Sequence, residues 1–141
     1  MNTVRSALEL PEGYASATVA RYLAQLDDQS RRLVAATATL TPADLEWQSA
    51  PGTNSIGMLL AHIAYAEVHL AAVGLEGRAT SDPKALIGIS EEEEGLPLAP
   101  GAPASPALAG RDVAFFHGAL EAARADLKRV AKELFHTTPV N

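Results

Sequence analysis

The segment from Ile56 to Val73 constrains the fold more than any other part of the sequence. Its residues are apolar almost all round a helical circumference, and only His62, Tyr65 and His69 make a polar stripe. Such a helix leaves little surface for water, so it needs neighbouring helices on most of its sides. The segment is long enough to raise the question of a membrane span, but its two histidines and Glu67 favour a buried core helix.

Two further long helices are predicted, one on each side of this segment. Apolar residues recur at three- and four-residue steps over about residues 16–40 and again, most regularly, over about residues 112–135. The central helix is expected over about residues 55–73, with Gly74 ending it in a left-handed conformation. Thr41 and Asp44 predict a capping box for a short helical turn, and we expect Trp47 to pack beside that turn.

The connection over residues 75–110 reads as a loop. It holds five of the nine prolines and five of the ten glycines, so no long regular element fits there. A structureless connection is usually no longer than about 12–15 residues, which leaves three alternatives. The segment is an active-site cover, a mobile linker, or the carrier of a short element around residues 85–89. The run Glu91–Glu94 is interpreted as solvated.

The number of helices in the bundle stays open at this point. Two partners do not cover a helix that is apolar on most sides, so a fourth helix is missing from this chain or is supplied by a second copy. A third possibility is that the chain is a piece of a longer gene product. We expect an all-α fold in a single domain over residues 1–141, because this length and 48% hydrophobic residues suffice for one core.

Charge and cysteine content exclude several classes of function. Seventeen acidic residues against eleven basic ones give a net charge of −6, which disfavours binding to nucleic acid and to anionic membranes. Without cysteine, the chain has no disulfide, no thiolate nucleophile and no cysteine-ligated metal. The N-terminal residues lack the apolar region of a secretory signal, so we expect a cytoplasmic protein.

A set of motifs surrounds the start of the central helix. In chain order they are Trp47, the turn Pro51-Gly52, the helix start Ser55-Ile56-Gly57, His62 and Glu67. In this order and spacing the set resembles the DinB/YfiT-like superfamily. The resemblance extends over about residues 14–135, through the connection and the third helix.

The resemblance implies an up-down-down-up four-helix bundle, often a homodimer, that holds a divalent metal such as Zn²⁺ or Ni²⁺ through three histidines. It implies that His62 is the ligand from the central helix and that an HxxxH motif on the fourth helix supplies the other two. This chain contains no HxxxH motif. The implied activity is a metal-dependent transferase or hydrolase that uses a low-molecular-weight thiol, with the metal favouring the thiolate.

The remaining histidines are weaker candidates for a metal site. His69 shares a helical face with His62, but the seven-residue step separates them by about 10.5 Å along the axis, too far for one ion. His117 reaches His62 only if the second and third long helices pack at matching heights. His136 follows the third helix. Glu67 is either a structural hydrogen-bond partner or an ion-pair anchor to a neighbouring helix.

Two hypotheses of function follow from these observations. The first is a metal-dependent enzyme that binds His62-ligated metal together with a small-molecule substrate or a low-molecular-weight thiol. The second is a metal-free helical binding or assembly module that acts as a homodimer. Retention of a cation that depends on His62 separates the two hypotheses.

Overall fold

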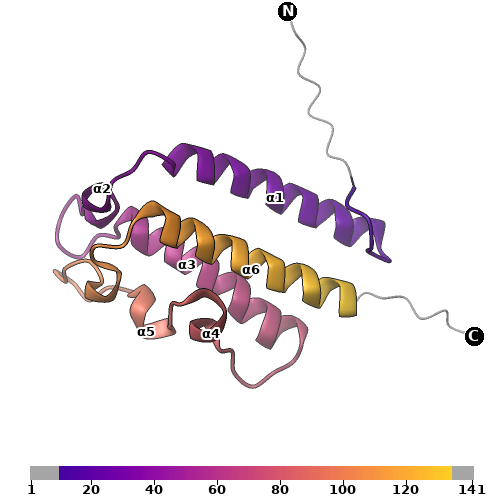
Figure 1. Ribbon diagram of the computed structural model, residues 1–141. Helices are drawn as coiled ribbons and strands as arrows, with labels where there is room; N and C mark the ends of the chain where they lie inside the picture. Colours follow the sequence, from indigo (N-terminus) through magenta and orange to yellow (C-terminus); the bar gives the residue numbers. More distant parts are fainter. Residues whose placement is uncertain (1–9, 135–141) are drawn as a thin grey trace, which may run out of the picture.

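The structure is a computed structural model that describes residues 10–134, where every regular element is helical. Three helices are long: α1 (Ala17–Thr37), α3 (Ile56–His69) and α6 (Val113–Leu134). α6 packs against both α1 and α3, and α1 runs in the opposite direction to the other two (Figure 1). The predicted all-α class is confirmed. A fourth helix, and with it the complete bundle order, stays a prediction.

The helix starts follow the capping signals of the sequence. Ser16 caps α1, and the predicted capping box of α2 (Pro42–Glu46) is confirmed by bonds of 2.9 and 3.2 Å between Thr41 and Asp44. The prediction for Trp47 is wrong, because 66% of this residue is exposed. Leu45 takes the inward position, and the backbone becomes extended at Trp47, where α2 ends.

The end of α3 also differs from the prediction. Gly74 does not stop the helix in a left-handed conformation, since the chain continues as the π-helical segment η1 (Leu70–Leu75). The amide of Glu76 donates to the carbonyl of Ala71 at 2.9 Å, a bond across five residues. This wider turn closes the helix without a positive φ, and the next left-handed residue is Gly77.

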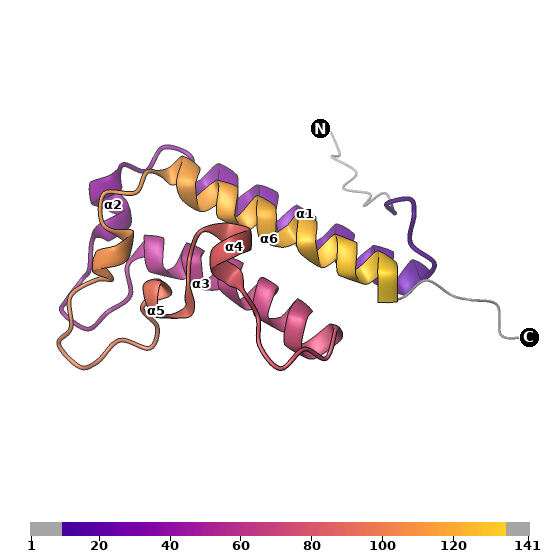
Figure 2. The ribbon, with the colours of Figure 1, turned by 60° about the horizontal axis from the view of Figure 1, so that its bottom comes forward.

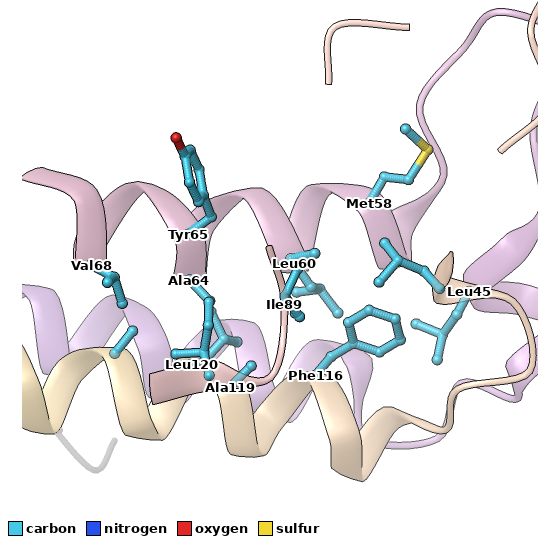
Figure 3. Close-up of a cluster of buried hydrophobic side chains, with 14 residues drawn as sticks. Leu45, Met58, Leu60, Ala64, Tyr65, Val68, Ile89, Phe116, Ala119 and Leu120 are labelled. Carbon is cyan, nitrogen blue, oxygen red and sulfur yellow. The ribbon is translucent and has the colours of Figure 1, made fainter. Parts of the chain in front are cut away.

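The stretch Ile56–Leu75 is long and apolar enough to cross a membrane by length and composition alone, and 44% of the 18-residue window that meets this test is buried inside the structure. Its inner side forms the centre of the core against α6. Figure 3 shows these side chains, which include Leu45, Met58, Leu60, Ala64, Val68, Ile89, Phe116, Ala119 and Leu120. Gly57 lets the two helices approach closely, because a Cβ there would lie 3.0 Å from Phe116 Cζ.

The connection between α3 and α6 is partly ordered into short helices. These are α4 (Pro83–Ile87), α5 (Glu91–Glu94) and the 3₁₀ turn η2 (Pro106–Leu108). α4 corresponds to the short element expected around residues 85–89. It packs on α3 and α6, whereas α5 packs on α3 (Figure 2). Ile87 and Ile89 are buried, so this connection is fixed to the core.

One arginine joins the three long helices. Arg124 on α6 donates to Glu67 on α3 at 3.1 Å, and to Asp27 and Ser30 on α1 at 2.8 and 3.0 Å. Glu67 is therefore an ion-pair anchor, one of the two roles considered for it. Burial by itself raises the pKa of Asp27, but hydrogen bonds from Lys128 and Arg124 outweigh it and hold that pKa below its usual range.

Candidate functional site

His62 and Glu94 form the most distinctive polar pair of the structure. His62 Nδ1 lies 2.7 Å from Glu94 Oε2, and the carboxylate side chain is only 3% exposed while the imidazole is 47% exposed. A carboxylate oxygen accepts hydrogen bonds, so the pair forms with the tautomer of His62 that carries its proton on Nδ1. The other nitrogen, Nε2, then carries the lone pair of this half-exposed ring.

Glu94 is placed by a local sequence signal in α5. Ser90 caps this turn, and the side chain of Glu93 completes a capping box by accepting from the Ser90 amide at 2.8 Å. Lys84 holds both oxygens of Glu93 on the outer side at 2.7 and 2.8 Å. Glu94, the next residue, is thereby turned inward toward α3, and Gly95 ends the turn in a left-handed conformation.

The interpretation of the whole glutamate run as solvated is therefore wrong at Glu94. The signal that points to an ordered turn is the pattern Ser90-x-x-Glu93, which is typical of a capping box. Nothing in the local pattern names His62 as the partner, because 32 residues separate the two side chains along the chain.

His69 repeats part of this arrangement about two helical turns further along α3. Its Nδ1 lies 3.0 Å from the hydroxyl of Ser81. Tyr65 lies between the two histidines, with ring-centroid distances of 6.4 Å to His62 and 5.6 Å to His69. Burial, and then the negative charge of Glu91, raise the pKa of Tyr65. Tyr65 therefore lies in the negative field of the α5 carboxylates, on the face of α3 that also carries the two histidines.

His117 is not brought to His62. Its Nε2 lies 2.7 Å from the hydroxyl of Thr37 on α1, so the ring is used in the contact between α1 and α6. It lines a cavity of about 450 Å³ between these two helices, together with Arg124 and Lys128. His136, the last histidine of the sequence, lies outside the described residues.

The ligand set in one copy does not fit a three-ligand metal centre. Within residues 10–134, no group of three or more histidine, aspartate or glutamate side chains is close enough to hold an ion. A catalytic zinc site needs about three protein ligands and one open position. The His62–Glu94 pair supplies one imidazole whose orientation is fixed by a carboxylate, which is the arrangement seen around single ligands of metal sites.

A comparison with protein families gives the wider relationship. A sequence profile described as the DinB superfamily matches residues 25–139, which is most of the chain. Searches among curated proteins and among solved structures found no match. The matched range includes α3 with His62, α5 with Glu94 and all of α6. The chain therefore belongs to the DinB superfamily.

Proposed function

We propose that this DinB-superfamily chain is a helical module that acts as a homodimer, in which a second copy covers an apolar face left open by the three long helices. The observation that carries the proposal is the exposure of large apolar side chains on α3 and α1. This open face consists of Ile56, Leu59 and Ile63 on α3 and Leu70 at the start of η1, with Tyr22 and Leu26 on α1, and each of the six is between 38% and 62% exposed.

The two parts of the open face border the same side of the molecule. On α3, Ile56, Leu59 and Ile63 lie within about 60° of one another around the helix, at 100° per residue, and Leu70 follows directly after the last residue of α3. On α1, Leu33 lies about 20° from Leu26 around the helix and packs against the core. Around α1, the exposed apolar residues therefore lie next to the core-facing ones. The same holds on α3, where the exposed residues lie next to the buried Leu60.

The size of the open face matches that of a dimer interface. A large apolar side chain offers about 200 Å² of surface. At their exposed fractions, the six residues expose roughly 600 Å² per copy, or roughly 1,200 Å² for two copies. Specific interfaces bury about 1,200–2,000 Å², so this face lies at the lower end of the range. None of its six side chains is charged.

The metal- and thiol-dependent transferase activity implied by family resemblance is the second candidate. The fixed orientation of His62 by Glu94 favours it, since this geometry directs one imidazole nitrogen outward as a ligand. The ligand count in one copy disfavours it, because the described residues bring no group of three metal-ligating side chains together. An acidic, cytoplasmic module without nucleic-acid or membrane partners is consistent with both candidates.

Analytical ultracentrifugation of the full chain over a range of concentrations tests the proposed homodimer. We expect a dimer that dissociates on dilution, and Leu59→Lys should shift the equilibrium strongly toward the monomer. Leu86→Lys is the matched control, because Leu86 on α4 is also 45% exposed but lies outside the open face. A wild-type chain that stays monomeric at high concentration, or equal effects of the two variants, would contradict the proposal.

A further inference from the structure

The cavity of about 450 Å³ between α1 and α6 lies between two polar contacts that join these helices. The helices run side by side in opposite directions (Figure 1). At one end of the cavity, His117 Nε2 lies 2.7 Å from Thr37 Oγ1. At the other end, Asp27 pairs with Lys128 at 2.7 Å and with Arg124 at 2.8 Å. Thr37 and Asp27 are ten residues apart, about 15 Å along α1, so the cavity is elongated.

The middle of this cavity is mostly apolar. α1 contributes Ser30 and Val34 to its lining, and α6 contributes Leu120 and Ala125. Ser30 and Ala125 have small side chains, which leave space between the two helices. A water molecule occupies about 30 Å³, whereas sites for small organic molecules have volumes of about 300–1,000 Å³. The size and lining are therefore those of a site for an organic molecule with an apolar body.

Basic groups outnumber acidic ones around the cavity. The charged lining residues are Arg31, Arg124 and Lys128 with Asp27 and Glu121. Both carboxylate oxygens of Asp27 are already engaged, Oδ1 by Arg124 and Oδ2 by Lys128. An ammonium group has three donors, so Lys128 can bind a second anion beside Asp27. The charge at this end of the cavity therefore favours a ligand that carries a negative group.

We infer that this cavity binds an organic monocarboxylate whose apolar body contains about eight carbon atoms. The carboxylate lies at Lys128, and the apolar body extends toward His117 along the apolar middle. A chain of eight carbons is roughly 10 Å long, because each C–C bond measures about 1.5 Å, so it fits within the length of the cavity. The inference goes beyond the proposed homodimer and does not depend on it, since α1 and α6 of one copy form the whole site.

The cavity is separate from the candidate site on α3. His62 and Glu94, on α3 and α5, are not among the residues that line it. The inference therefore assigns a role to the space beside His117 and Arg124, two residues that the candidate site on α3 does not use.

Isothermal titration calorimetry of the full chain with octanoate tests the inference. We expect one saturable site per chain, with an affinity more than tenfold above that for butanoate, because each buried methylene raises the affinity roughly fourfold. 1-Octanol and octylammonium have the same chain without the negative charge, so both should bind at least about tenfold more weakly. No saturable binding at millimolar octanoate, or equal binding of the three eight-carbon ligands, overturns the inference.

A variant that fills the cavity locates the binding site. Val34→Phe places a larger side chain in the cavity and should abolish octanoate binding. Val19→Phe is the matched control, because Val19 is also half-buried on α1 but does not line the cavity. It should bind octanoate like the wild type, and circular dichroism checks that both variants are folded. Octanoate binding retained by Val34→Phe would place the ligand elsewhere, for example on the open face, and overturns the inference.

A second variant tests the charge and does not depend on filling the cavity. Lys128→Met keeps the aliphatic stem and removes the ammonium group, so the affinity for octanoate should fall about tenfold. The affinity for 1-octanol should stay unchanged, because the apolar middle of the cavity is intact. An unchanged affinity for octanoate, or an equal loss for both ligands, would overturn the placement of the carboxylate at Lys128.

Discussion

Leu59 and Leu60 are neighbours on α3, yet 45% of the first and only 2% of the second is exposed. The inner side of α3, with Leu60, Ala64 and Val68, is covered by α6 and α4. The outer side, with Leu59, Ile63 and Leu70, is equally apolar but has no cover in the described chain. Apolar composition therefore marks a surface that is to be buried, but it does not specify which molecule buries it.

Truncation on the inner side should have the largest effect. Leu60→Ala removes buried methyl groups from a packed core and leaves a cavity, so we expect a loss of about 3 kcal/mol in the free energy of unfolding. Urea denaturation followed by circular dichroism at low protein concentration measures it. A loss below about 1 kcal/mol would show that this side of α3 is loosely packed.

Loss of Arg124, which joins the three long helices, should reduce the free energy of unfolding by nearly as much as Leu60→Ala. Arg124→Met leaves Glu67 and Asp27 without their shared cation, so we expect a loss of about 3 kcal/mol, reduced where solvent reaches Asp27. Arg32→Met is the control on the solvent side of α1, where the ion pair with Asp28 leaves the arginine 69% exposed and such exposed pairs contribute about 0–1 kcal/mol. If the two variants unfold at the same urea concentration, the buried network has no special role.

Acid should weaken the same network. Because the pKa of folded Asp27 lies below its unfolded value, the unfolded chain binds more protons in the interval between them. Stability is then present above the unfolded pKa of about 4 and falls as pH decreases through the folded pKa. In Asp27→Asn, the thermal melting temperature should depend less steeply on pH in this acidic range than in the wild type. An unchanged pH dependence in the variant would assign the acid sensitivity to other carboxylates.

Loss of the N-cap of α3 should have a smaller effect on stability than the changes above. The Ser55 hydroxyl accepts from the Met58 amide at 3.2 Å, and Ser55 is only 3% exposed. Ser55→Ala leaves this amide without its partner, so we expect a loss of about 1 kcal/mol. Ser55→Asp, which keeps a capping oxygen, should retain more of the stability in the same denaturation assay. A fully stable alanine variant would show that another group caps α3.

The smallest effect on the monomer is expected on the outer side. Leu59→Ala removes groups that are already half exposed. At protein concentrations at which the wild type is monomeric, the free energy of unfolding of the variant should therefore stay within about 0.5 kcal/mol of the wild-type value. At high concentration the same variant should lose the extra stability that dimerisation gives to the wild type. An equal effect at both concentrations would place Leu59 in the monomer core instead of in the interface.

Features of the fold that depend on residues close together in the sequence could be predicted, and features that depend on packing between distant segments could not. Capping at Thr41 and Asp44 and the periodicity of the long helices depend on neighbours within a turn or two, and these features were predicted correctly. Trp47 and Gly74 were not, because their conformations depend on how Leu45 and the π-helical turn fill space in the folded chain.

The candidate site shows the same limit. His62 was predicted from its place in a motif, and Glu67 from its charge within an apolar helix. Glu94 was missed, since its partner lies 32 residues away and its inward direction depends on the packing of α5. His117 was considered as a partner of His62, but the relative rotation of α3 and α6 directs it to Thr37 instead. Contacts between distant segments are not encoded in local spacing.

Arg124 has a consequence for the motions of the molecule. α1 is joined to the rest mostly through this polar network and a few buried residues, namely Ala20, Leu23, Ala24 and Thr37. α3 and α6 share a continuous apolar contact. Local opening is favoured where few apolar contacts must be broken. The amide protons of α1 should therefore exchange with solvent sooner than those of α3 and α6, with α1 leaving the bundle as one cooperative unit.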